Sequence, residues 1–212
     1  MKLSILASAA LVICLSVVGA SALTLKTEPG PTNIEKVSIA QSATTADGIK
    51  LVSVGAGLRT KKVVFVNVKV YIGQLFVANI GAFRKNISEA LKSSADAAPI
   101  AIQLHFLRDV DAEKVQSSFK DALESNKVDL KKTEIEKFLS AVKTSGAAKE
   151  GKSLTILGSK AKDGTETIVY EDVNGKATTV GGPAGFIQEI FAIWLGTPSD
   201  DGVAKLKAEI LK

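Results

Sequence analysis

The chain has 212 residues and a formal net charge of +5, from 27 basic and 22 acidic side chains. Aromatic residues form only 5% of the sequence and the lysines are interspersed with acids, a pattern that disfavours nucleic-acid binding. Cys14 is the single cysteine, which excludes an intramolecular disulfide and a cysteine-based metal centre. A chain of this length can bury a hydrophobic core of its own.

The first 22 residues have the pattern of an export signal. Lys2 precedes an apolar run at 3–18, and Ala20-Ser21-Ala22 fits a small-residue cleavage site before Leu23. The run is short for a membrane-spanning anchor, and no basic stop-transfer cluster follows it. We therefore expect residues 1–22 to be a cleaved signal peptide. The mature protein is expected to be periplasmic or secreted, with no integral membrane span.

The segment after the signal is expected to precede the folded domain. Residues 23–48 read as a leader that contains Thr, Ser and Pro, within which 34–39 can add an edge strand. We place a single domain at 49–212. Its first strand, at 49–54, is expected to run into a tight turn at Gly55-Ala56-Gly57, because glycine adopts backbone conformations that other residues avoid.

A long β-branched run at 63–77 predicts a strand with a bend near Gly73. Strand side chains alternate between faces, so one face is expected to be apolar and the other polar. The apolar, core-facing set is Val64, Val66, Val68, Val70 and Ile72. The opposite set is Asn67, Lys69 and Tyr71. Polar groups in such a run must face either solvent or a ligand.

The remaining elements are predicted from caps, turns and periodicity. The predicted helices are a short one at 87–91, one capped by Asp111, one with a capping box of Thr133 and Glu136, one at 186–195, and a last one capped by Ser199. The predicted strands are 100–107, 153–159, 165–171 and 176–180. Asp-Gly at 163–164 and Asn-Gly at 174–175 predict hairpin turns. This order indicates an α+β fold, an antiparallel sheet with helices packed on one face.

The single histidine, His105, is the first candidate for catalysis or metal binding. It lies in a predicted strand between Leu104 and Phe106, and the sequence lacks the G-x-S-x-G turn of a serine nucleophile. A metal site needs several converging ligands. We therefore expect His105 to be structural, and we predict neither a metal nor a cofactor; catalytic residues stay unassigned.

Three segments together resemble one known superfamily. They are G-A-G-L-R-T-K-K-V-V-F-V-N-V-K-V-Y at 55–71, L-H-F-L-R-D-V at 104–110 and F-A-I-W-L-G at 191–196. In this order they resemble the chalcone-isomerase-like superfamily. The resemblance is closer to its bacterial chalcone-isomerase-like proteins and plant fatty-acid-binding members than to its flavonoid enzymes. It implies an antiparallel sheet with helices on one face, forming an apolar cleft.

The resemblance also implies two ligand-binding residues. In the fatty-acid-binding relatives, an arginine after the glycine turn and a tyrosine on the next strand hold the ligand carboxylate. Arg59 and Tyr71 match these positions. A guanidinium offers a two-pronged donor to a carboxylate, and a phenol adds a third hydrogen bond. The alternative is that Arg59 pairs with a surface acid and Tyr71 only packs.

The hydroxyl and amide groups of the flavonoid enzymes are not matched. Their positions fall near Val66, Lys114 or Val115, Asp121 or Ala122, and Ile193. Without these groups, the steering of a phenolate and its water is missing. The expected function is therefore binding of a fatty acid or similar amphiphile without catalysis. An isomerase (intramolecular lyase) with an unknown substrate at the same cleft is the alternative, and a structural protein with a vestigial cleft is a third.

Overall fold

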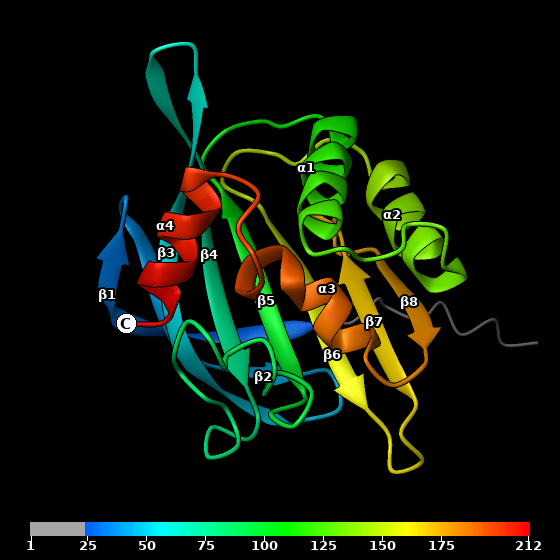
Figure 1. Ribbon diagram of the computed structural model, residues 1–212. Coiled ribbons are helices and arrows are strands. Elements are labelled where there is room, and N and C mark those ends of the chain that lie inside the picture. Colours follow the sequence, from blue (N-terminus) through cyan, green and yellow to red (C-terminus); the bar gives the residue numbers. More distant parts are fainter. Residues whose placement is uncertain (1–23) are drawn as a thin grey trace, which may run out of the picture.

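The computed structural model describes residues 24–212, which form one eight-stranded antiparallel sheet and four α-helices (Figure 1). The expected signal peptide, 1–22, lies outside the described residues. The strands follow each other in sheet order as in sequence: β1 Leu25–Ile34, β2 Val37–Thr45, β3 Lys50–Val63, β4 Val66–Val77, β5 Ile100–Phe106, β6 Ser153–Lys160, β7 Glu166–Glu171 and β8 Ala177–Gly182. The helices are α1 Ala112–Ser125, α2 Thr133–Thr144, α3 Phe186–Leu195 and α4 Asp201–Ile210.

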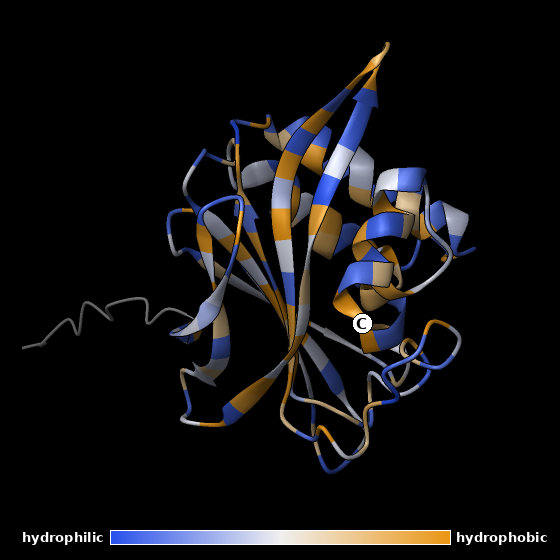
Figure 2. Cartoon of the chain, turned by 90° about the vertical axis from the view of Figure 1, so that its left-hand side faces the viewer, coloured by the Kyte–Doolittle hydropathy of each residue, from blue (hydrophilic) through white to orange (hydrophobic). Residues whose placement is uncertain are grey.

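The helices lie on one face of the sheet, as predicted, and the main core lies between the two layers (Figures 1 and 2). Periodicity located this core well. The predicted faces of α1 and α2 are buried, as are the alternate residues of β5: Val115, Phe119, Leu123, Ile135, Phe138, Leu139, Val142, Ile100, Ile102, Leu104 and Phe106. The α+β arrangement and the antiparallel sheet are therefore confirmed.

The sheet begins before the expected domain boundary at residue 49. β1 and β2 form a hairpin, and β2 pairs with β3, so most of the expected leader belongs to the sheet. Pro29 coincides with a register shift in β1, at the sheet edge, where a residue without an N–H is tolerated. The side chain of Gln74 binds the backbone of Ala40, donating to its oxygen at 2.6 Å and accepting from its nitrogen at 3.1 Å. This bridge holds β2 to the face of β4 that the helices leave open.

The predicted glycine turn at 55–57 is wrong, because these residues lie inside β3. The chain turns instead at Val64 and Phe65, between β3 and β4. The glycines are needed for another reason, the close approach of α4. A β-carbon on Gly55 would collide with the backbone oxygen of Ile210, and one on Gly57 would lie 2.7 Å from Glu209 Cβ.

The predicted faces of β4 also need correction. Arg59 pairs with Tyr71, but the next residue of β3, Thr60, pairs with Lys69, so Val70 is an extra residue in β4. A one-residue bulge reverses the alternation of side chains beyond it. Tyr71 therefore belongs to the core on the helix side, whereas Lys69 reaches the β1–β2 turn and pairs with Glu35 at 2.6 Å.

Smaller differences concern caps and one short helix. Residues 87–91 form successive turns rather than a regular helix. The N-cap of α2 is Lys132, one residue before the predicted Thr133. The N-cap of α4 is Asp200, not Ser199, and its carboxylate accepts from the Val203 nitrogen at 3.0 Å. The turns at 163–164 and 174–175 connect β6, β7 and β8 as predicted.

Candidate functional site

A cavity of about 510 Å³ lies between the β3–β4 hairpin, the end of β5 and helix α1. Its buried lining is mainly apolar and includes Leu104, Phe106, Val115, Phe119, Ile193 and Val203. Its exposed lining is mainly charged and includes Lys61, Arg108, Asp109, Lys114 and Asp121. The cavity thus combines an apolar interior with a charged mouth. This combination suits a ligand that has an apolar body and a polar end.

The two residues singled out in the sequence, Arg59 and Tyr71, both line this cavity. They face each other across β3 and β4, and they are 4% and 8% exposed. Among the described residues, they are the only buried members of the lining that carry polar side-chain atoms. The bulge at Val70 is what turns Tyr71 toward this side of the sheet. The fold therefore brings the predicted pair together at the apolar wall.

The guanidinium of Arg59 already has partners inside the protein. Its Nη2 lies 2.6 Å from Asp200 Oδ2, and its Nη1 donates to the Thr60 oxygen. Burial by itself would raise the pKa of the Asp200 carboxyl, but hydrogen bonds from Arg59 and from the Val203 amide lower it to about 2. Asp200 thus stays ionised at neutral pH and joins β3 to the start of α4. The expected alternative, an arginine paired with an acid, exists in the structure.

The Tyr71 side chain contacts helix α3 and strand β5. Trp194 Nε1 donates to the Tyr71 oxygen at 3.2 Å, and the Phe106 ring lies 5.6 Å from the Tyr71 ring. Burial raises the pKa of the Tyr71 phenol, and the nearby Arg59 charge opposes this only in part. The phenol is therefore protonated at neutral pH. Because its oxygen accepts from Trp194, its own O–H can donate to a group in the cavity.

Residues 31–212 match a family model described as chalcone isomerase-like. The chain belongs to the chalcone isomerase-like family. It is also similar to the crystal structure of a fatty-acid-binding protein from Arabidopsis thaliana, with a TM-score of 0.57 and 14% identity. That similarity covers 88% of this chain and 96% of the plant protein, and at this identity it concerns the fold. No curated protein sequence matches the chain.

Most of the positions that the sequence resemblance aligns with the flavonoid enzymes also lie at the cavity. Lys114, Val115, Asp121, Ala122 and Ile193 are all in its lining. Val66, in contrast, is exposed at the start of β4 and is not in the lining. Five of these six positions therefore face the cavity, and none of the five carries a hydroxyl or an amide group.

Two residues of the candidate site escaped the sequence analysis. Ser118 lines the cavity from α1, where it follows Val115 by three residues and so shares its helical face. The three-residue spacing from Val115 is therefore a sequence signal that could have identified Ser118. Asp200 is 141 residues from Arg59 in sequence, and no local pattern indicates that the two form an ion pair.

His105 does not belong to the cavity lining. Its Nδ1 lies 3.1 Å from Ser153 Oγ, across β5 and β6, and burial lowers the pKa of its imidazole. Within residues 24–212, no group of three or more His, Cys, Asp or Glu side chains could hold a metal ion. No helix in this part of the chain has the length and apolar character needed to cross a membrane.

Proposed function

We propose that this protein is exported and binds a fatty acid or similar amphiphile in the cavity, without catalysis, with Arg59 and Tyr71 at the carboxylate. The single observation that supports this most is the placement of these two side chains. They are the only buried polar side chains in the described lining, which is otherwise apolar where it is buried. The plant protein of similar fold, whose title names it a fatty-acid-binding protein, supports the same ligand class.

The ion pair with Asp200 defines how a ligand would bind. A guanidinium has five N–H donors, and the two internal partners of Arg59 do not exhaust them. A ligand carboxylate would share the guanidinium with Asp200 and accept a further hydrogen bond from Tyr71. Since two carboxylates near one cation repel each other, Asp200 should weaken ligand binding while it stabilises the fold.

The test is a titration with a fluorescent fatty acid. A hydrogen bond to a charged group contributes about 1.5–3 kcal/mol, against about 1 for a neutral bond. Arg59→Ala should therefore raise the Kd about tenfold or more, and Tyr71→Phe should raise it less. Arg59→Lys should not restore binding, because an ammonium lacks the planar fork. Arg84→Ala, at an exposed position outside the lining, is the matched control and should bind like the wild type.

Asp200→Asn separates a carboxylate clamp from a purely structural arginine. It removes the competing charge but keeps a side chain that can cap α4. If Arg59 binds the ligand, this variant should bind the fatty acid more tightly than the wild type, and a matched fatty alcohol should show no such gain. If Arg59→Ala stays folded and binds the fatty acid as tightly as the wild type, the proposal is wrong.

Export can be tested separately by intact mass. The Ala20-Ser21-Ala22 site predicts that the secreted form begins at Leu23. A full-length species retained in a membrane would contradict this part of the proposal without touching the ligand site.

An isomerase is the second candidate, and Ser118 is the observation in its favour, because this hydroxyl lines the cavity beside Val115. We nevertheless expect no useful cyclisation of a hydroxychalcone, since Val66, the Lys114 or Val115 position and Ile193 stand where hydroxyl-bearing residues would steer a phenolate. A spectrophotometric assay decides the matter. Turnover well above the spontaneous rate would favour the enzyme if the Arg59→Ala variant loses that turnover.

A further inference from the structure

The tip of the β3–β4 hairpin is the most exposed apolar segment among the described residues. Val63, Val64, Phe65 and Val66 are 52%, 76%, 92% and 65% exposed. We call these four residues the apolar tip. Figure 1 shows the hairpin projecting beyond the sheet and the helices, and in Figure 2 its end is coloured as hydrophobic. Within residues 24–212, no element covers it.

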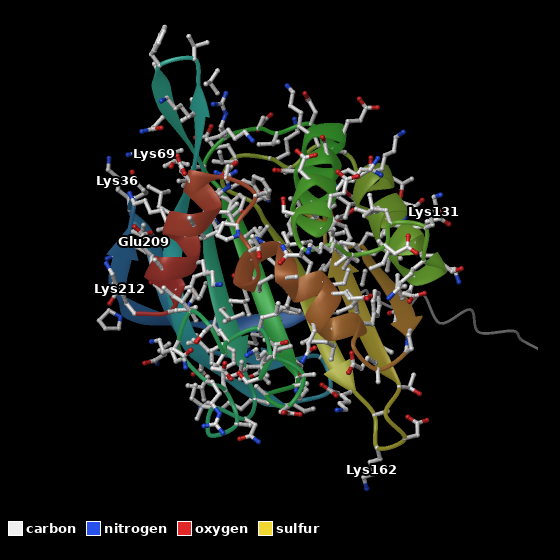
Figure 3. The ribbon with its side chains drawn as sticks, viewed as in Figure 1. Lys36, Lys69, Lys131, Lys162, Glu209 and Lys212 are labelled. Carbon is white, nitrogen blue, oxygen red and sulfur yellow. The ribbon has the colours of Figure 1, made fainter. Side chains whose placement is uncertain are left out.

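The chain beside the apolar tip is basic. Between residues 59 and 71 it carries Arg59, Lys61, Lys62 and Lys69, and no acid. Two acids from elsewhere pair with three of these cations: Asp200 with Arg59 and Lys61, and Glu35 with Lys69. Lys62 is exposed and has no ion pair within the described chain. The base of the projection, where Figure 3 labels Lys69, therefore has an excess of positive charge.

The same hairpin forms one wall of the cavity. Lys61, Val63 and Val68 belong to the cavity lining, so the apolar tip lies beside the exposed mouth. Two cations of the mouth, Lys61 and Arg108, lie on β3 and just after β5, and the mouth also contains Lys114, Asp109 and Asp121.

We propose that the apolar tip docks into the surface of an anionic lipid bilayer, with its valines and Phe65 among the acyl chains and Lys62 at the headgroups. Apolar side chains that enter the interface, together with basic residues at headgroup level, are the combination that binds such surfaces. A second copy of the chain fits less well. A stable protein interface uses about 20–30 residues on each side, whereas the apolar tip has four and projects. Docking does not depend on a ligand, but it would bring the cavity mouth to the lipid.

The experiment is flotation of the exported protein with vesicles of phosphatidylcholine alone and with one third phosphatidylglycerol. All proteins compared share the same N-terminus, so differences between variants report on the hairpin. We expect the wild type to float with the anionic vesicles and to be released by salt, because salt screens surface charge. The double variant Val64→Ser/Phe65→Ser should lose about tenfold or more in affinity.

Charge is tested by Lys62→Glu, which should weaken binding to the anionic vesicles about fivefold or more and have little effect with the neutral ones.

Two matched controls lie away from the apolar tip. Ile87→Ser changes an isoleucine that is 63% exposed, in the loop at the other end of β4. Lys162→Glu changes an exposed lysine that Figure 3 shows far from the hairpin. Both controls should float like the wild type.

Phe65→Trp supplies an independent readout, because the native Trp194 is 1% exposed and gives a constant background. The emission of the tryptophan introduced at position 65 should move to shorter wavelength with anionic vesicles and stay unchanged with neutral ones. If the double serine variant floats as well as the wild type, the proposal is wrong. If the wild type does not float but forms a dimer that this variant dissociates, the apolar tip binds a second copy and the bilayer proposal is likewise overturned.

Discussion

The two halves of the β3–β4 hairpin differ in burial: α4 covers the lower half, and the end of the upper half is exposed. In the lower half, Gly55, Gly57 and Gly73 have no side chain and lie under α4, with Leu206 lying 3.3 Å from where a β-carbon of Gly73 would be, and Leu75 beside them is fully buried. The upper half ends in the apolar tip, the four residues 63–66, and is exposed. Arg59 and Tyr71 lie between the two halves, where the helix layer ends and the cavity begins.

This contrast shows that burial depends on the presence of a neighbouring element and not only on the apolar character of a residue. Glycine in β3 allows a helix backbone to approach closely, and that approach brings Asp200 within reach of Arg59. Past the N-terminus of α4, none of the helices in residues 24–212 covers the hairpin, so large apolar side chains stay in solvent. Four substitutions test the contrast, from the largest expected effect to the smallest.

Gly55→Ala should have the largest effect on stability. Its β-carbon would collide with the backbone oxygen of Ile210 and lie 3.0 Å from the carbonyl carbon, so α4 must move. Overpacking of this kind costs about 3 kcal/mol in the free energy of unfolding. Urea denaturation measures it. Gly81→Ala is the control, because its β-carbon meets nothing closer than 3.6 Å, and its stability should be close to that of the wild type.

Asp200→Asn should cost about 1–2 kcal/mol of stability, because hydrogen bonds from buried Arg59 and from the Val203 amide lower the pKa of the Asp200 carboxyl, while solvent screens part of the interaction at a side chain that is 30% exposed. The folded pKa, about 2, is below the ordinary value of 3.8. The stabilisation is therefore complete above about pH 5 and is lost as the pH falls toward 2. Urea titrations across this range should show a smaller acid loss in the variant. An equal acid loss in both proteins would show that Asp200 is not responsible.

The control for Asp200→Asn is Asp109→Asn, which removes a carboxylate whose partner is Lys149. Both side chains of that pair are largely exposed, at 60% and 57%. Solvent screens such a pair, so its removal should change stability much less.

Tyr71→Phe should cost about 1 kcal/mol, the contribution of one neutral hydrogen bond, because it leaves the buried indole N–H of Trp194 without its acceptor. Denaturation of the ligand-free protein measures this cost apart from any loss of binding. If stability is unchanged while fatty-acid binding falls, the phenol acts on the ligand and does not stabilise the junction between the two halves.

Phe65→Ser should have the smallest effect on stability, within about 0.5 kcal/mol, because an exposed side chain has no packing to lose. Phe65 is 92% exposed. Leu75→Ala, at a fully buried position of the same hairpin, should in contrast cost about 2–5 kcal/mol. A large loss of stability in Phe65→Ser would mean that the apolar tip is packed against something in solution, and the contrast between the two halves would fail.

The sequence by itself determined the elements whose signals are local. Helix faces such as Val115, Phe119 and Leu123 repeat with the helical period, and Asp-Gly and Asn-Gly pairs specify turns through their backbone conformation. The family resemblance, carried by three segments between residues 55 and 196, indicates Arg59 and Tyr71, and the fold brings both to one cavity.

Only the tertiary structure decided how the β3–β4 hairpin is used. A glycine in sequence indicates freedom of the backbone, but it does not tell whether that freedom serves a turn or, as at Gly55, the approach of a helix. The bulge at Val70, which reverses the faces of β4, leaves no mark in a run of β-branched residues. The ion pair of Arg59 with Asp200 joins positions 141 residues apart. Each of these depends on which distant segment packs nearby, and that is a property of the whole fold.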